Sequence, residues 1–208
     1  MNYDHVFVKS DIVSLLAARL IQLNSTDSIL MLHPNAEIGM PTTSCGLFSS
    51  PEVLDRLELG SIPASVCISR TSLRSEWFEK HLAIVLANNG AEISTRASLN
   101  IVSRNQGIIT GSSSITGEIG YEILHDIVIP TSNSHQWYCN IHTNPPPSEI
   151  IFFSQRSDES FESWSKENIR VPSTFEHRVG TGTITSPNTI DLNLEIATNY
   201  VDQSLNIE

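Results

Sequence analysis

The sequence predicts an α/β protein in which a domain with parallel strands is followed by a smaller, mostly antiparallel β region. Three observations predict this fold class. Apolar runs at His5–Val8 and Ile29–Leu32 enclose a stretch with helical periodicity. Short segments with strand character then follow one another over residues 98–124. The composition changes near residue 130, so we expect one domain at 1–130 and a second at 131–208.

The N-terminal residues predict a strand–helix–strand unit. Apolar residues recur every three or four positions over Asp11–Leu23, which is typical of an amphipathic helix. The run Ile29–Leu32 contains no polar residue, as expected of a strand that is buried on both faces. Because parallel neighbours need a crossover connection and the helix supplies one, we expect the two flanking strands to be parallel.

A second amphipathic helix is predicted before the next strand. Its inward face is expected to carry Trp77, Phe78, Leu82 and Leu86. It should end at Asn88-Asn89-Gly90, because glycine readily adopts the left-handed conformation that ends many helices.

The remaining segments predict short elements. Residues 41–60 are rich in turn formers, with one weak helical patch at Glu52–Leu57. Strands are expected at Ala91–Ser94, Ser98–Ser103, Gly107–Ile109, Ile119–Leu124, Ile127–Pro130 and Ile150–Phe153. We expect Ser154–Glu167 to be weakly ordered or helical, Gly180–Gly182 to form a hairpin turn and Thr183–Leu194 to be β-like.

Composition and charge exclude several classes of protein. Twelve basic against 23 acidic residues leave a net charge of −11, and such a surface repels phosphate backbones, so no nucleic acid partner is expected. No stretch approaches the length of a membrane span, and Met1–Asp4 lacks the basic start of a signal peptide. Cys45, Cys67 and Cys139 are an odd number without a Cys-x-x-Cys pair. We therefore expect a cytoplasmic protein without a membrane span.

Two clusters contain side chains that can take part in catalysis or metal binding. His135, Cys139 and His142 fit no zinc-binding spacing, and the aromatic residues between them indicate an alternating strand, so no metal is expected. The acidic residues in the Ser-rich run indicate a solvated face; they are Asp158, Glu159, Glu162 and Glu167. The catalytic residues stay unknown from the sequence.

Three blocks resemble one known family. The first is Tyr3–Val8 with Leu15–Leu20, the second runs from Glu37 to Ser49, and the third from Arg70 to Ile93. In order and spacing they resemble the FAD-binding oxidoreductases of the geranylgeranyl reductase, lycopene cyclase and aromatic monooxygenase type. The resemblance implies a Rossmann-like βαβ nucleotide-binding domain, to which such families append an antiparallel substrate-binding sheet.

The sequence departs from this family where the cofactor phosphates would lie. The three glycines of the Gly-x-Gly-x-x-Gly turn are replaced by Lys9, Asp11 and Ser14. The acidic residue that would hold the adenosine ribose corresponds to His33. A late Gly-Asp motif is missing, and the chain has about half the usual family length. The resemblance is thus to a degenerate, truncated relative.

The resemblance, together with the positions at which the sequence differs from the family, implies two possible functions. The first is a non-catalytic, flavoprotein-like subunit or binding module without a cofactor, which acts through a protein partner or as a homo-oligomer. The alternative is an FAD-dependent oxidoreductase that acts on an apolar, isoprenoid-like substrate. If FAD is bound, the resemblance assigns its contacts to Lys9, Ser10, Asp11, Ser14, His33, Cys45, Gly46 and Arg70.

Overall fold

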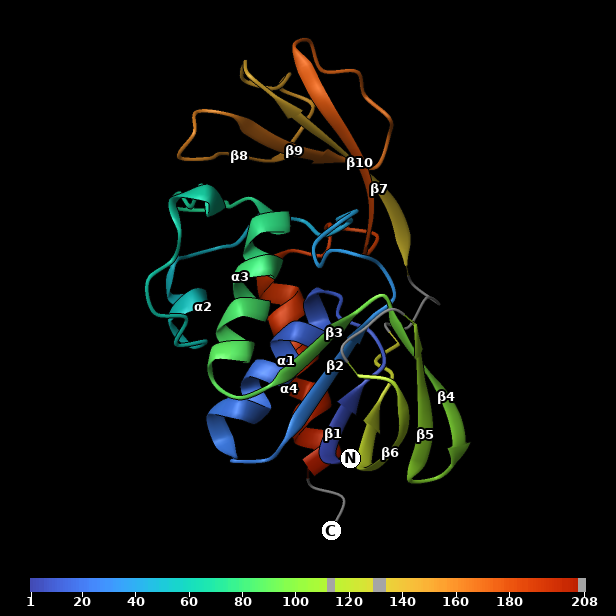
Figure 1. Cartoon of the computed structure of the whole chain (residues 1–208). Coiled ribbons are helices and arrows are strands. Elements are labelled where there is room, and N and C mark those ends of the chain that lie inside the picture. The colour runs from blue at the N-terminus through green and yellow to red at the C-terminus, as the bar shows by residue number, and fades with distance from the viewer. Residues whose placement is uncertain (112–114, 129–133, 206–208) are drawn as a thin grey trace. The chain divides into compact units, whose positions relative to one another are not determined.

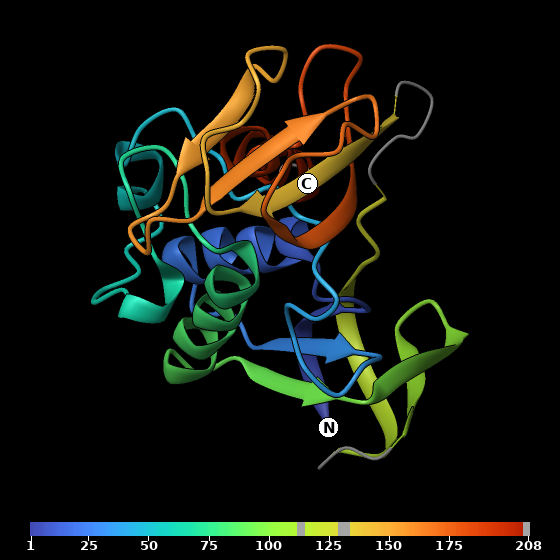
Figure 2. The same cartoon turned by 90° about the horizontal axis from the view of Figure 1, so that it is seen from above.

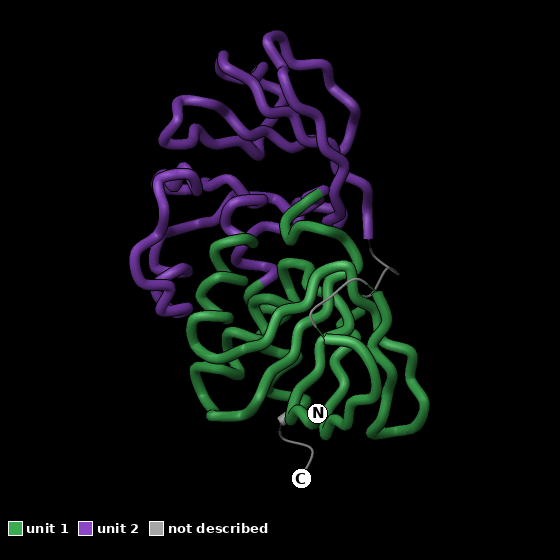
Figure 3. Tube along the Cα trace, viewed as in Figure 1, with its two compact units in different colours: residues 1–40, 79–128, 194–208 green, residues 41–78, 129–193 purple. Residues whose placement is uncertain are grey.

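The computed structural model describes residues 1–111, 115–128 and 134–205, and the chain forms two compact units. Unit 1 comprises residues 1–40, 79–128 and 194–208, and unit 2 comprises residues 41–78 and 129–193 (Figure 3). The sequence placed a single boundary near residue 130, whereas each unit in the structure is assembled from separate segments. Helices α3 (Ser75–Asn88) and α4 (Ile190–Leu205) each begin in unit 2 and continue in unit 1.

Unit 1 contains a six-stranded sheet in the order β3-β2-β1-β6-β5-β4 (Figure 1). Strand β1 pairs in parallel with β2 and β6, and β2 pairs in parallel with β3. Strand β5 is antiparallel to both β4 and β6. The predicted parallel pairing and the predicted meander are confirmed. The bounds are β1 Asn2–Phe7, β2 Ile29–His33, β3 Glu92–Thr95, β4 Ala97–Ser103, β5 Gln106–Gly111 and β6 Gly117–His125.

The predicted helices of unit 1 are present with one correction. Helix α1 covers Ile12–Asn24, and Gly90 ends α3 with a φ of +98°. Phe78 and Leu82 of α3 are fully buried, as predicted. Trp77, however, is 38% exposed, so its inward placement was wrong. Trp77 is exposed because it lies in the first turn of α3, whereas the later members of its row, His81 and Val85, are buried.

One strand prediction fails at the end of unit 1. Ile127 and Val128 belong to no strand, and the last two residues of that prediction, Ile129 and Pro130, lie outside the described residues. Strand β6 ends at His125, whose carbonyl accepts a hydrogen bond from the Val8 N–H at 3.1 Å. The apolar residues after β6 predicted a further strand, but apolar composition alone does not distinguish a strand from an irregular segment.

Alternate residues of the parallel strands face two different layers. Val6, Leu30 and Leu32 pack against the meander, through Ala97 and Ile109. His5 and Phe7 point to the opposite face, where helices α1 and α4 lie (Figures 1 and 2). This arrangement explains why all five residues of β2 are buried, as its continuous apolar run predicted.

A chain of polar contacts crosses the helix-facing side of unit 1. The Tyr200 hydroxyl of α4 donates to His125 Nδ1 at 3.0 Å, and His125 Nε2 donates to His5 Nδ1 at 2.9 Å. His5 Nε2 then donates to the Asp27 carboxylate at 3.1 Å. Phe7 stacks on the His125 ring, with the ring centroids 4.2 Å apart. All contacts are satisfied when both imidazoles are neutral.

Unit 2 contains a four-stranded antiparallel sheet in the order β10-β7-β9-β8. The strands are β7 His135–His142, β8 Phe152–Gln155, β9 Phe161–Ser165 and β10 Thr174–Gly182. The segment before α3 adds the short helix α2 (Glu52–Asp55), within the predicted helical patch, and the 3₁₀ turn η1 (Ala64–Val66). One face of the sheet buries an apolar cluster formed by Cys45, Leu47, Trp137, Cys139, Ile141 and Trp164.

The antiparallel character of this region is confirmed, but several of its elements were predicted wrongly. Residues 154–167, expected to be weakly ordered or helical, contain strand β9. Gly180–Gly182 lie inside β10 and not in a hairpin turn. The strand expected at Ile150–Phe153 is shifted to Phe152–Gln155.

The expected β segment at Thr183–Leu194 is instead a turn followed by the start of helix α4. Ile190, Leu192 and Leu194 alternate with polar residues, which mimics a strand. The buried residues that continue this stripe, Ala197 and Val201, have helical spacing. No helix among the described residues combines the length and apolarity needed to cross a membrane.

The buried His125 makes the stability of the protein dependent on pH. Burial, and then the charge of His5, lowers the pKa of His125 from 6.5 to about 3. Between these values the unfolded chain binds a proton that the folded chain does not. We therefore expect the free energy of unfolding to fall by up to about 4 kcal/mol as the pH drops from about 6.5 to 3. Urea unfolding at a series of pH values measures this.

His125→Gln removes the titrating group, so its unfolding free energy should depend less steeply on pH over that range. His135→Gln, which changes an exposed histidine, serves as the control. Equal pH dependence of the wild type and His125→Gln would contradict the assignment.

Candidate functional site

The loop between β1 and α1 lies where a dinucleotide phosphate would be bound in a parallel α/β fold. Asp11 is the N-cap of α1, and its carboxylate Oδ1 accepts a hydrogen bond from the Ser14 N–H at 2.9 Å. Such a contact satisfies one of the free N–H groups at the start of a helix. The protein's own carboxylate therefore occupies the electropositive end of α1.

The residues of this turn do not fit a pyrophosphate group. Lys9, Asp11 and Ser14 each carry a side chain where glycines would let the ligand and the helix approach closely. The Lys9 ammonium, which could offset the Asp11 charge, lies 2.8 Å from the Asp126 carboxylate. The buried Ser14 hydroxyl has no hydrogen-bond partner among the described residues. A bound pyrophosphate would have to displace the Asp11 carboxylate from the helix end.

His33 ends β2 at the position of the expected ribose contact, and its ring is already satisfied. Its Nε2–H donates to the Glu37 carbonyl at 3.0 Å, and its Nδ1 accepts from the Ser10 hydroxyl at 2.7 Å. Burial lowers the pKa of His33, so the imidazole is neutral at neutral pH. The structure thus brings Ser10 and His33 together, but in contact with each other.

The three remaining expected residues lie in unit 2. Cys45 is buried, and burial, followed by the charge of Glu162, raises the pKa of its thiol well above the usual value. A thiol in this state is a poor nucleophile. Arg70 is exposed. Gly46 is buried, and a Cβ at this position would lie 2.1 Å from the Leu73 carbonyl oxygen, so only glycine allows the two segments to pair.

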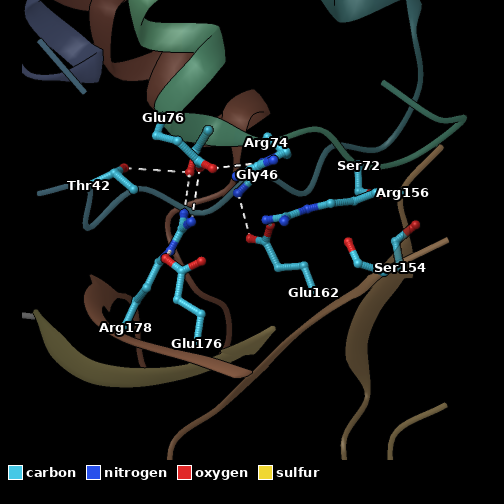
Figure 4. A network of polar contacts seen from close by, with 12 residues as sticks. Thr42, Gly46, Ser72, Arg74, Glu76, Ser154, Arg156, Glu162, Glu176 and Arg178 are labelled. Atoms are coloured by element: carbon cyan, nitrogen blue, oxygen red, sulfur yellow. Dashed lines mark hydrogen bonds and ion pairs between the residues drawn. The ribbon is translucent and has the colours of Figure 1, made fainter. Parts of the chain in front are cut away.

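Glu162 is the centre of a buried polar cluster beside Gly46 (Figure 4). One carboxylate oxygen accepts from the Gly46 N–H and from the Trp164 indole N–H, each at 2.7 Å. The other oxygen accepts from the Arg156 guanidinium. The side chains of Arg156 and Glu162 are 2% and 0% exposed, so the ion pair is removed from water.

A second buried ion pair joins β10 to the start of α3 (Figure 4). Arg178 Nη2 donates to Glu76 at 3.0 Å, and Arg178 Nη1 donates to the Ser75 hydroxyl at 3.1 Å. Arg74 also donates to Glu76, at 2.8 Å. Burial alone would raise the pKa of Glu76, but the charge of Arg178, a backbone hydrogen bond and the contact with Arg74 together outweigh burial and hold that pKa below its usual value.

Sequence reasoning missed these charged residues. The sequence predicted that Glu162 lies on a solvated face. This prediction is wrong, because Glu162 is fully buried. Its neighbour Trp164, two positions along the same strand, was the available signal, because alternate strand residues share a face. Arg156 and Arg178 gave no comparable signal in the sequence.

The three residues with His and Cys side chains near residue 140 belong to one strand. His135, Cys139 and His142 lie on β7, and the even spacing of four places the first two on one face while His142 faces the other. Among the described residues, no group of three or more His, Cys, Asp or Glu side chains could hold a metal ion.

Comparison of solved structures confirms the predicted resemblance at the level of the fold, which is that of FAD-dependent oxidoreductases. A geranylgeranyl bacteriochlorophyll reductase-like protein from Thermoplasma acidophilum superposes with a TM-score of 0.69 at 12% identity, over 98% of this chain and 77% of its own. A flavoprotein/dehydrogenase from Cytophaga hutchinsonii gives a TM-score of 0.54 at 12% identity, over 88% and 67%.

A myxobacterial chondrochloren halogenase, described as a variant of FAD-dependent halogenases, gives a TM-score of 0.52 at 8% identity. The match covers 88% of this chain and 53% of the halogenase. No family model matches the chain, and no curated protein is significantly similar to it in sequence. The similarity is therefore one of fold, with little sequence in common.

The buried Glu162 is expected to be essential for the stability of unit 2. Glu162→Gln keeps the size of the side chain but leaves the Arg156 guanidinium buried without a counter-charge, which typically costs about 3 to 5 kcal/mol. Urea unfolding of the variant should show a loss of this size. Glu167→Gln changes an exposed carboxylate and should unfold within about 0.5 kcal/mol of the wild type. Equal stability of the two variants would contradict the role given to Glu162.

Proposed function

We propose that this chain is a non-catalytic binding module built on the fold of FAD-dependent oxidoreductases, and that it acts through a protein partner or a second copy of itself. One observation carries the proposal: the Asp11 carboxylate caps α1 at the position that a cofactor phosphate would need. The contact between Ser10 and His33 supports it, because it uses the groups nearest the expected ribose.

The charge of Asp11 opposes pyrophosphate binding strongly. Two like unit charges about 4 Å apart repel each other by about 4 kcal/mol at an effective dielectric constant near 20. This corresponds to a loss of affinity of roughly a thousandfold. Lys9 could reduce the repulsion only by leaving Asp126, with which it is paired. Loss of the cap would also destabilise the helix by about 1 kcal/mol.

Exposed apolar side chains support a role in association. In unit 2, Ile151 is 77% exposed, Phe153 is 46% exposed and Ile184 is 59% exposed. Ile151 lines one cavity with Ile184 and a second with Phe153, and contiguous apolar surface on a folded protein often marks a place where another molecule binds.

The alternative is an FAD-dependent oxidoreductase that acts on an apolar, isoprenoid-like substrate. Two observations favour it besides the fold. The Ser14 hydroxyl at the start of α1 is buried and has no partner among the described residues. Unit 2 also has a cavity of about 500 Å³ with apolar lining residues that include Trp137, Ile150, Phe152 and Trp164. A measurement of FAD binding distinguishes the two proposed functions.

The first function predicts that purified protein is colourless and that FAD does not raise its melting temperature. Asp11→Asn keeps a good N-cap and removes the charge, so its stability should match that of the wild type. The same change should improve any residual FAD affinity by one to three orders of magnitude, because the repulsion is gone. Absorption spectra and thermal melts across an FAD titration measure this.

Asp4→Asn, which neutralises a carboxylate at the other end of β1, is the matched charge control. A yellow wild-type protein, or a melting temperature that rises with FAD concentration, would overturn the proposal in favour of the oxidoreductase. In that case Asp11→Asn should leave FAD binding similar to that of the wild type or better.

The association predicted here is measurable separately. Sedimentation velocity at micromolar concentration should show a species heavier than the 23.0 kDa monomer, or a partner that copurifies in fixed ratio. A strictly monomeric protein without a partner would contradict the proposed role even if FAD does not bind.

A further inference from the structure

A polar cavity lies on unit 2, beside the strand residue Arg178. It has a volume of about 440 Å³ and is lined by side chains of β7, β10 and the segment between β9 and β10. Its lining includes Tyr138, Asn168, Arg170 and His177, and no carboxylate. In a chain with a net charge of −11, this local excess of basic and donor groups is unusual.

The lining side chains are available to a ligand. Within the described part of the chain, the side chains of Tyr138, Asn168, Arg170 and His177 take part in no hydrogen bond or ion pair with the protein. Arg178 differs, because its guanidinium is already bound to Glu76, Glu176 and Ser75. Four donor groups are therefore unused at one cavity.

Strand geometry places three of the lining residues on one face. Tyr138 of β7 is directly opposite Val179 of β10, and His177 lies two positions before Val179. Because strand residues alternate, these side chains share the face opposite to Cys139 and Arg178, which are paired across the same two strands. Tyr138, His177 and Val179 therefore line the cavity from one face of the strand pair, while Cys139 and Arg178 of the same two strands complete its lining.

The segment that carries Asn168 and Arg170 is held in place by buried contacts. The Asn140 side chain, 1% exposed, donates to the Ile169 carbonyl at 3.2 Å. Val171 is buried, and its carbonyl accepts from the Thr174 hydroxyl at 2.7 Å. Residues on both sides of Ile169 are therefore positioned before any ligand arrives, which reduces the entropic cost of binding.

We propose that this face of the β7–β10 pair binds a small oxyanion, a molecule with a phosphate or carboxylate group. The Arg170 guanidinium suits such groups because its planar N–H donors match two oxygens at once. His177, Asn168 and Tyr138 supply further donors, and Val179 with the Tyr138 ring offers an apolar wall for the rest of the molecule. The volume is within the range of small-molecule sites.

The test is a titration of the ¹⁵N-labelled full chain with inorganic phosphate and, separately, with acetate, both at constant ionic strength. We expect saturable changes of the amide signals of residues 138, 168–170 and 177–179. Arg170→Gln should weaken binding about tenfold or more, as expected for loss of a charged hydrogen bond. Arg104→Gln removes an exposed arginine in the turn between β4 and β5 and should leave the affinity unchanged.

The two anions distinguish the possible ligands, because tighter binding of phosphate indicates a phosphorylated molecule and tighter binding of acetate a carboxylic acid. Tyr138→Phe keeps the ring and should weaken binding by a smaller factor than Arg170→Gln. Changes that do not saturate, or equal effects of Arg170→Gln and Arg104→Gln, would overturn the proposal, since they would show only general charge screening. None of these variants touches the turn at Asp11, so the result is independent of FAD binding.

Discussion

The contact between the Asp11 carboxylate and the Ser14 N–H sets both the local fold and the chemistry of unit 1. It starts helix α1, and α1 is the crossover that lets β1 and β2 pair in parallel. In dinucleotide-binding proteins the N–H groups at this end of the helix donate hydrogen bonds to a ligand phosphate. Here the Asp11 carboxylate accepts a hydrogen bond from one of these N–H groups, so the residue that caps α1 also places a negative charge at this helix end.

Unit 2 depends on charge in a different way. Its sheet buries two arginines, Arg156 and Arg178, and each is neutralised by a buried glutamate. Glu162 also fixes the Gly46 segment through its backbone N–H. Buried ion pairs contribute little net stability, but removing one partner is costly. These pairs therefore hold the strands to the segment before α3 in one arrangement, in which the Cys45 thiol is shielded from water.

The fold and the proposed function are separate conclusions, because a common fold can carry different activities. The superposed proteins share about a tenth of their residues with this chain, so the shared fold leaves the cofactor question to the residues at the site. There, Lys9, Asp11 and His33 are each bound to another group of the protein. Among the described residues, four donor side chains without a protein partner lie together elsewhere, around Arg170 on unit 2.

The sequence by itself determined the elements whose signal is local. The apolar run of β2, the periodicity of α1 and the glycine after α3 each predict one element, because the pattern depends on neighbours a few residues apart. The family resemblance was also readable, from blocks in the right order. Tertiary structure alone decided β9, the start of α4 and the burial of Glu162. Burying a carboxylate is costly unless it is paired and hydrogen-bonded. The partners of the Glu162 carboxylate are the Arg156 guanidinium and the Gly46 N–H, and only the folded chain brings them together. The sequence shows the charge, whereas the fold determines whether that charge meets water or a counter-ion.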